Sequence, residues 1–126
     1  NRSMRIISGT LRGKKLLTPK DNYTRPLRDA VKESIFNILQ HSKLLNFKLF
    51  NSRVLDLFSG VGTFGLECIS RNSRQVTFFE NHNLALKMLK KNIQNLILLV
   101  KNGVTIQFEL PIGKKEITTR MVTNPI

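Results

Sequence analysis

The sequence predicts an α/β fold, with a parallel sheet that follows an N-terminal β-hairpin. Two apolar strand-like segments, residues 53–58 and 75–80, alternate with two helical segments, residues 63–71 and 83–96. Strands that alternate with helices in this way form parallel sheets with right-handed crossovers. A chain of 126 residues has room for one domain, so we expect a single unit over residues 4–126.

The first part of that domain is predicted to be a basic hairpin arm. The apolar runs "MRIISG" and "KKLLTP" are separated by "TLRG", which predicts a turn from Gly9 to Gly13. A polar loop then ends in Pro26, a residue that is tolerated in the first turn of a helix. We therefore divide the domain into an arm, residues 4–26, and an α/β core, residues 27–126.

The segment "LRDAVKESIFNILQ" predicts the first helix of the core. Its apolar side chains recur at helical spacing, so one face is expected to pack inward and the other to meet solvent. The residues expected to face inward are Val31, Ile35, Ile38 and Leu39. Those expected to face solvent are Arg28, Lys32 and Glu33. In the later helix, the residues expected inward are Leu84, Ala85, Met88, Leu89, Ile93 and Leu96.

The strongest feature of the composition is a net charge of +13. Residues 1–53 carry twelve Lys and Arg against three acidic residues, a net of +9, whereas residues 54–126 carry nine against five, a net of +4. A basic front half indicates a polyanionic partner, most simply nucleic acid. A basic surface kept for solubility is the alternative. An anionic membrane is less favoured, because the basic residues do not line one face of a long helix.

The composition favours no membrane, secreted or metal-binding class. The longest apolar run, residues 96–100, is too short to cross a bilayer. Residues 1–3 are interpreted as a remnant of an expression vector, and no signal peptide follows them. The single cysteine, Cys68, excludes an internal disulfide bond and fits a reducing cytosol, so we expect a cytoplasmic protein. With His41 and His82 as the only histidines, we expect no metal site.

A glycine-rich turn follows the first strand of the core. Gly60, Gly62 and Gly65 have the spacing Gly-x-Gly-x-x-Gly. In open α/β sheets, cofactors bind beyond the carboxyl ends of the strands, where glycines let the cofactor approach the backbone. Gly65 is expected to allow close helix–strand packing instead. The spacing alone fits a dinucleotide as well as other cofactors that contain adenosine.

Two acidic residues distinguish between these cofactors. Asp56 ends the first strand; a carboxylate there repels a diphosphate but attracts the amino group or sulfonium of S-adenosylmethionine. Glu80 ends the next strand, where it can accept hydrogen bonds from both ribose hydroxyls of either cofactor. We therefore interpret the loop as a site for S-adenosylmethionine. The alternatives are that Asp56 only interacts with a helix N-terminus and that Glu80 is an ordinary exposed acid.

Three stretches, "MRIISGTLRGKKLLTP", "TRPLRDAVKESIFNIL" and "VLDLFSGVGTFGLECISR", resemble the ribosomal RNA small subunit methyltransferase D family. The resemblance extends from Met4 to about Leu96. It implies a Rossmann-like S-adenosylmethionine-dependent methyltransferase fold with a hairpin extension. It also implies methyl transfer to the exocyclic N2 of a guanine in 16S rRNA, with the small ribosomal subunit as partner.

The resemblance also implies roles for individual residues. The cofactor-binding residues would be Asp56, Phe58, Ser59, Gly60, Gly62, Glu80 and Asn81. Phe58 would contact the cofactor only through its backbone, since its side chain is expected to pack in the core or the loop. The RNA-binding residues would be Arg5, Arg12, Lys14, Lys15, Arg25 and Arg28.

The C-terminal part departs from the family pattern. Enzymes that methylate exocyclic amines carry Asp/Asn-Pro-Pro-aromatic after the fourth strand, where oxygens accept the amine hydrogens and the ring stacks on an extruded base. This chain has Asn124, Pro125 and Ile126 at that point, without the second proline or the aromatic residue. Asn124 is the candidate catalytic residue, and a tail without a role is the alternative. The segments "VTIQFEL" and "EITTRMVT" are weak strand candidates, so we expect an incomplete sheet.

Other functions and assemblies therefore stay open. The chain could be a truncated or inactive relative that binds cofactor or RNA without turnover, or part of the protein could be absent from the sequence. A small NAD-binding oxidoreductase fragment is a further alternative, against which Asp56 argues. An incomplete parallel sheet leaves an unpaired edge, so we also expect self-association through that edge.

Overall fold

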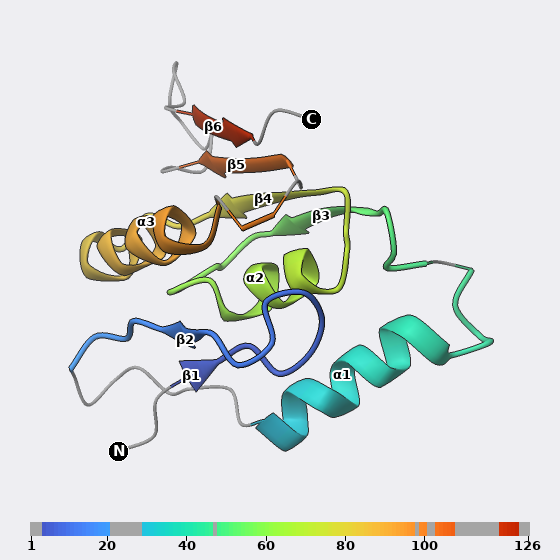
Figure 1. The fold of residues 1–126 in the computed structure, drawn as a ribbon. Coiled ribbons are helices and arrows are strands. Elements are labelled where there is room, and N and C mark those ends of the chain that lie inside the picture. Colours follow the sequence, from blue (N-terminus) through green and yellow to red (C-terminus); the bar gives the residue numbers. More distant parts are fainter. Residues whose placement is uncertain are drawn as a thin grey trace.

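The computed structural model describes residues 4–20, 29–46, 48–97, 99–100, 103–107 and 119–123. A hairpin of β1 (Met4–Arg5) and β2 (Lys15–Leu16) leads to α1 (Asp29–His41). The core then runs through β3 (Arg53–Asp56), α2 (Thr63–Ser70), β4 (Gln75–Phe79) and α3 (Asn83–Ile97), and continues in β5 (Gly103–Gln107) and β6 (Thr119–Thr123). Figure 1 shows the hairpin and α1 on the same side of the sheet as α2.

The predicted parallel sheet is confirmed. Its strand order is β3-β4-β5-β6, and β3, β4 and β5 run parallel with α2 and α3 as the crossovers. The last strand, β6, instead pairs antiparallel with β5, so that Thr119 lies opposite Gln107 and Thr123 opposite Gly103. Within the described residues, β3 therefore forms one edge of this sheet and β6 the other.

Close packing of α2 on the sheet depends on a glycine. A Cβ atom at Gly65 would lie 2.3 Å from the Phe78 ring, so the helix could not approach β4 this closely with any other residue. The Cys68 side chain, on the same helix, is fully buried. The first observation confirms the predicted close helix–strand packing at Gly65, and the second places Cys68 in the core.

The hairpin arm belongs to the hydrophobic core. Its turn runs from Gly9 to Gly13, as the sequence predicted, and both glycines have positive φ angles. Ile6 and Leu11 of the arm are at most 1% exposed and belong to the same buried cluster as residues of α2 and α3. The arm is thus attached to the α/β unit through buried apolar contacts, which exclude water from the junction.

The predicted inward face of α1 is wrong in part. Val31 and Ile38 are 45% and 58% exposed, whereas Lys32 and Phe36 are at most 1% exposed. The helix is rotated because Lys32 reaches a buried carboxylate on α2 and because Phe36 stacks on Phe64, with ring centroids 5.2 Å apart. An ion pair and an aromatic contact therefore override the apolar periodicity.

The prediction for α3 holds at most positions. Leu89, Ile93 and Leu96 are buried as expected, and Met88 packs against the core. Leu84 is the exception, because 39% of it is exposed. It lies in the first turn of the helix, at the edge of the packed region.

The segment around β3 was predicted to be an apolar strand, and the structure buries it only in part. Val54 packs against the core, but Leu55 is 57% exposed. Successive side chains of a strand point to opposite faces of the sheet. Because β3 is the outermost strand of the described sheet, the face that carries Leu55 stays open at this position.

Candidate functional site

The two predicted strand-end acids lie at the same edge of the sheet. Asp56 is the last residue of β3, and Glu80 directly follows β4. The two strands are parallel neighbours, with Asp56 opposite Phe78, so both carboxylates emerge where the strands end. This is the edge at which open α/β sheets bind ligands.

Asp56 is buried and incompletely hydrogen-bonded. Burial raises the pKa of its carboxyl group above the usual 3.8, the nearby Glu80 carboxylate adds to the rise, and neighbouring hydrogen-bond donors, chiefly the Gly65 N–H, partly oppose it. Its Oδ2 atom is buried and has no hydrogen-bond partner among the described residues. A buried oxygen without a donor is rare at a purely structural position, so we treat this atom as the candidate acceptor for a donor group of a ligand.

Ser59 ties the glycine loop to the end of β4. Its backbone N–H donates to the Phe79 carbonyl (3.0 Å), and its Oγ accepts a hydrogen bond from the Phe79 N–H (3.1 Å). The same hydroxyl donates to the Asp56 carbonyl oxygen (2.9 Å). These bonds satisfy the Ser59 side chain within the protein, so it acts here as a support for the loop.

Glu80 holds the loop through its two carboxylate oxygens. The Gly60 N–H donates to Oε1 (2.7 Å), and the His82 N–H donates to Oε2 (3.0 Å). Each oxygen has a further lone pair, which leaves capacity for two more donors. The carboxylate therefore joins the glycine loop to the start of α3 while remaining able to accept hydrogen bonds from a ligand.

The two loop glycines are required for different reasons. Both have positive φ angles, +57° at Gly60 and +100° at Gly62, which favour glycine. A Cβ at Gly62 would lie 2.8 Å from Leu89 Cδ1, so this glycine permits tight packing of α2 against α3. A Cβ at Gly60 would meet no atom within 4 Å, so the loop is open on that side.

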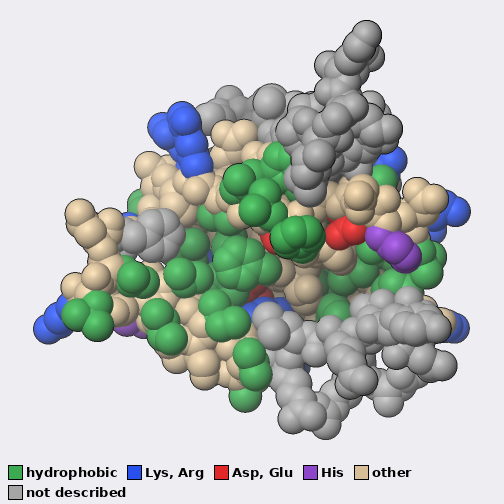
Figure 2. Space-filling model, turned by 180° about the vertical axis from the view of Figure 1, so that it is seen from behind, with side chains coloured by type: hydrophobic (Ala, Val, Ile, Leu, Met, Phe, Trp, Pro, Cys, Tyr) green, Lys and Arg blue, Asp and Glu red, His purple; other side chains and the backbone are tan. Residues whose placement is uncertain are grey.

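The rim of the site differs from the prediction. Phe58 is 83% exposed, so the expected packing of its side chain in the core or loop is wrong. It follows the edge strand, and Leu57 beside it is 46% exposed. Asn81 is also exposed. Figure 2 shows hydrophobic side chains gathered near the centre of the back face, with acidic side chains among them.

The predicted RNA-binding residues are not equally free. Arg12, Lys14 and Lys15 are exposed on the arm. Arg5 is exposed as well, but its guanidinium group forms an ion pair with Asp29, with Nη2 3.0 Å from Oδ2. Arg25 and Arg28, named with them from the sequence, lie outside the described residues.

Asn124 also lies outside the described residues, but the strand before it is described. Because β6 runs antiparallel to β5, Thr123 lies opposite Gly103 at the start of β5. Asp56 and Glu80 lie at the other end of the parallel strands. The backbone of β6 therefore runs away from the candidate cofactor edge.

A buried charged cluster was missed by sequence reasoning. Glu67 of α2 is 0% exposed, and its carboxylate pairs with Lys32 of α1 (3.2 Å) and with Arg71 (2.9 Å). The Arg71 guanidinium lies 4.5 Å from the centre of the Phe36 ring and donates to Gln40 Oε1 (2.7 Å). The available signal was a single acid in an apolar helix with an arginine four residues later.

The environments of Cys68 and His82 indicate structural roles for both residues. Burial raises the pKa of the Cys68 thiol, which disfavours the reactive thiolate. His82 is exposed, and its Nδ1 accepts a hydrogen bond from the Ala85 N–H in the first turn of α3. In the part of the chain that the structure describes, no three His, Cys, Asp or Glu side chains gather as a metal site would need, and no helix is long and apolar enough to span a membrane.

Comparison with known proteins agrees with the geometry. The family described as "Conserved hypothetical protein 95" matches residues 4–116. The chain is 40% identical over 93 residues to Ribosomal RNA small subunit methyltransferase D of Haemophilus influenzae, and 36% identical over 93 residues to the protein of that name in Escherichia coli. These alignments cover 74% of this chain but 45% and 44% of the relatives, so the chain spans about half of their length.

Solved structures show the same architecture. The Escherichia coli protein yhhF aligns with a TM-score of 0.62 at 33% identity, over 75% of this chain and 47% of that one. A hypothetical protein of Thermus thermophilus aligns with a TM-score of 0.59 at 18% identity, over 96% of this chain and 99% of that one. The second match shows likeness of fold alone.

Proposed function

We propose that this chain, which belongs to the family of the ribosomal RNA small subunit methyltransferase D proteins, binds S-adenosylmethionine at the loop between β3 and α2. The family is the one described as conserved hypothetical protein 95. The observation that carries this proposal is the buried Oδ2 of Asp56, which lacks a donor among the described residues. An ammonium group of the cofactor would supply that donor. The fold would then be a Rossmann-like methyltransferase fold.

The residues around this loop fit the cofactor. Asp56 would hold the positively charged methionine end, and Glu80 would accept hydrogen bonds from the ribose while it keeps its bonds to Gly60 and His82. The open side of Gly60 leaves room for the cofactor against the backbone. Phe58 and Asn81 would border the site.

The substrate that we propose is the small-subunit rRNA, with transfer to the exocyclic N2 of a guanine in 16S rRNA. The cofactor supplies an electrophilic methyl group on a sulfonium. The protein would position the acceptor in line with it, so the rate would depend on proximity and on exclusion of water. Arg12, Lys14 and Lys15 on the arm would contact RNA phosphates.

A second candidate is binding of cofactor and RNA without turnover. The direction of β6 favours it, because this strand leads away from Asp56 and Glu80, whereas catalysis at Asn124 would need the chain to return to them. Incubation with methyl-labelled S-adenosylmethionine and purified small ribosomal subunits separates the two. Label in the rRNA supports the enzyme, and its absence despite cofactor binding supports the second candidate.

The cofactor proposal is tested by calorimetry with S-adenosylmethionine and, separately, with NADH. We expect saturable binding of the methyl donor only, and about tenfold weaker binding for Glu80→Gln, which loses acceptor capacity. The matched control is Glu33→Gln, an exposed acid on α1. Binding of NADH instead would support the oxidoreductase alternative, and binding of neither ligand would refute the proposed site.

A further inference from the structure

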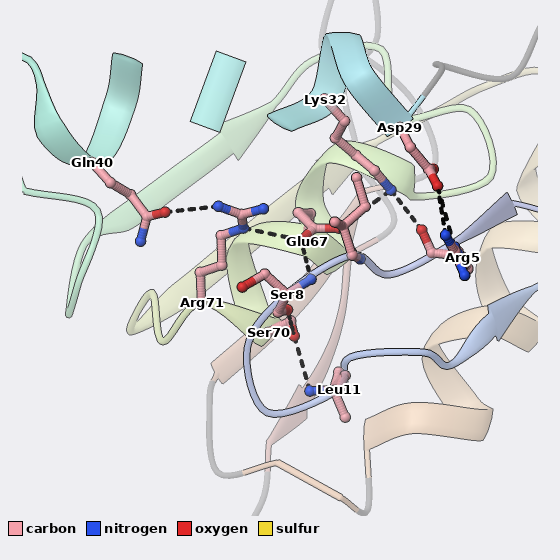
Figure 3. Close-up of polar contacts among 10 residues, drawn as sticks. Arg5, Ser8, Leu11, Asp29, Lys32, Gln40, Glu67, Ser70 and Arg71 are labelled. Carbon is pink, nitrogen blue, oxygen red and sulfur yellow. Dashed lines mark hydrogen bonds and ion pairs between the residues drawn. The ribbon is translucent and has the colours of Figure 1, made fainter. Parts of the chain in front are cut away.

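The cluster around Glu67 joins the N-terminal arm, α1 and α2, which are far apart in the sequence (Figure 3). We propose that Glu67 and Ser70, both on α2, fix the turn of the arm to the core and so set the place at which its basic side chains meet RNA. The RNA part of this inference rests on the proposed function. Both residues would be positioning residues, since neither would contact the substrate.

Glu67 binds the backbone of the arm directly. Its Oε1 accepts a hydrogen bond from the Ile7 N–H (3.0 Å), and its Oε2 accepts one from the Ser8 N–H (3.1 Å). The same two oxygens pair with Lys32 Nζ and Arg71 Nε. Each carboxylate oxygen thus has one backbone and one cationic partner, and the carboxylate is fully buried. A buried polar network that is fully satisfied in this way makes the local structure rigid.

Ser70 adds a second attachment one helical turn later. Its hydroxyl accepts a hydrogen bond from the Leu11 N–H (2.9 Å) and donates to the Ser8 carbonyl oxygen. Its backbone carbonyl accepts from the Thr10 N–H (2.8 Å). Backbone groups from residue 7 to residue 11 are therefore held by two residues of α2.

The turn lies so close to α2 that only glycine fits at one position. A Cβ at Gly9 would lie 1.9 Å from the Ser70 carbonyl oxygen, and the Gly9 φ angle is +89°. Gly13, in the same turn, has a φ angle of +85°, but a Cβ there would meet nothing within 4 Å. The two glycines share the backbone strain and differ in contact with α2, so they form a matched pair for a test.

A fixed turn would matter for RNA binding because it orders the side chains that carry the charge. Arg12, Lys14 and Lys15 follow the attached segment and are exposed. If the turn were loose, RNA would have to order it on binding, which lowers affinity. Net charge alone predicts the opposite for Glu67, since removal of an acid should strengthen binding to a polyanion.

The first experiment compares Gly9→Ala with Gly13→Ala. We expect Gly9→Ala to weaken binding to purified small ribosomal subunits by about tenfold, and Gly13→Ala by less than about twofold. Binding of S-adenosylmethionine should stay the same in both, which shows that the core is folded. Amide exchange at Ile7, Ser8 and Leu11 should become faster in Gly9→Ala only.

The second experiment compares Glu67→Gln with Glu33→Gln, which change the net charge equally. We expect weaker subunit binding and faster exchange at Ile7 and Ser8 for Glu67→Gln, and slightly tighter binding for Glu33→Gln. Tighter binding in both variants, or unchanged exchange in a folded Gly9→Ala, would overturn the inference. If the unaltered chain binds no subunit, the RNA part falls with the proposed function, while the exchange data still decide whether α2 fixes the turn.

Discussion

Two polar regions of the molecule are built in opposite ways. At the junction of arm, α1 and α2, Glu67 is buried and each of its oxygens has two partners. At the edge formed by the ends of β3 and β4, Asp56 is also buried, yet its Oδ2 has no partner among the described residues, and Phe58 beside it is 83% exposed. Charge and burial are similar, but only one of the two carboxylates is satisfied within the described chain.

This difference separates a structural acid from a candidate binding acid. A satisfied carboxylate stabilises the fold and leaves nothing for a ligand. An unsatisfied one costs stability that a ligand could return on binding. We therefore expect substitutions at the junction to act on folding stability and on the attachment of the arm, and those at the edge to act mainly on cofactor binding.

The largest effect is expected for Glu67→Ala. It leaves Lys32 and Arg71 buried without their anion and removes the acceptors of two arm amides. Loss of one partner from a buried ion pair destabilises a protein by about 3–5 kcal/mol. Urea denaturation measures this, with the exposed Glu33→Ala as control. A loss below about 1 kcal/mol would show that the junction does not depend on this acid.

In contrast to Glu67→Ala, Asp56→Asn should weaken cofactor binding and leave folding stability intact. We expect binding of S-adenosylmethionine to weaken by about tenfold, or 1.4 kcal/mol, without loss of folding stability. The folded Asp56 has a raised pKa, so its contribution to stability falls as the pH rises from the usual 3.8 through that raised value. Because asparagine does not titrate, the substitution removes this loss of stability at higher pH.

Denaturation of both proteins across pH 3 to 8 (roughly from below the ordinary pKa of aspartate to well above it) tests this prediction. The stability of Asp56→Asn relative to the unaltered chain should increase with pH. The exposed Asp29→Asn is the matched control. Undiminished cofactor binding, or a difference that shrinks with pH, would contradict the assignment of Asp56.

A smaller effect is expected at the open edge of the sheet. Leu55 on β3 is 57% exposed, and we predict concentration-dependent self-association through this edge. Leu55→Lys should weaken association by about fivefold, close to 1 kcal/mol, as measured by sedimentation velocity. Leu99→Lys, at a site with 55% exposure outside the sheet, is the control. Equal association of the two variants would locate the contact elsewhere.

The smallest effect is expected for Asp29→Asn. The Arg5–Asp29 ion pair is exposed on both sides, with side-chain exposures of 60% and 46%, so its loss should change stability by less than about 0.5 kcal/mol. The freed Arg5 should strengthen subunit binding slightly, by less than about threefold. A titration at two salt concentrations measures this, and weaker binding would argue against contact between Arg5 and RNA.

The sequence was sufficient where the local pattern and the tertiary structure agree. The hairpin, the strand–helix alternation, the inward face of α3 at Leu89 and Ile93, and the close packing at Gly65 were all predicted. Each depends on apolar periodicity or on the absence of a side chain, and both can be read locally. The positions of Asp56 and Glu80 at one edge follow from the same alternation, because parallel strands end together.

Other features required the tertiary structure. The inward face of α1 was mispredicted because Lys32 points inward to form an ion pair with Glu67 on α2. The two residues are 35 positions apart, so the apolar periodicity of α1 does not reveal this partner. Phe58 was expected to pack in the core or loop, but it is exposed because it follows β3, the outermost strand, where no further described strand covers it. The antiparallel direction of β6 likewise depends on which edge the chain reaches.

The sequence by itself therefore determined the order of the elements, the family, and the acids of the candidate cofactor edge. Only the tertiary structure decided which polar groups are satisfied. Glu67 and Asp56 are both single acids in apolar segments, and the sequence does not show which of the two carboxylates finds its donors within the chain. Their difference is set by the N–H groups of the arm and the cations at positions 32 and 71, which folding brings to Glu67, while Asp56 Oδ2 receives no donor from the described chain.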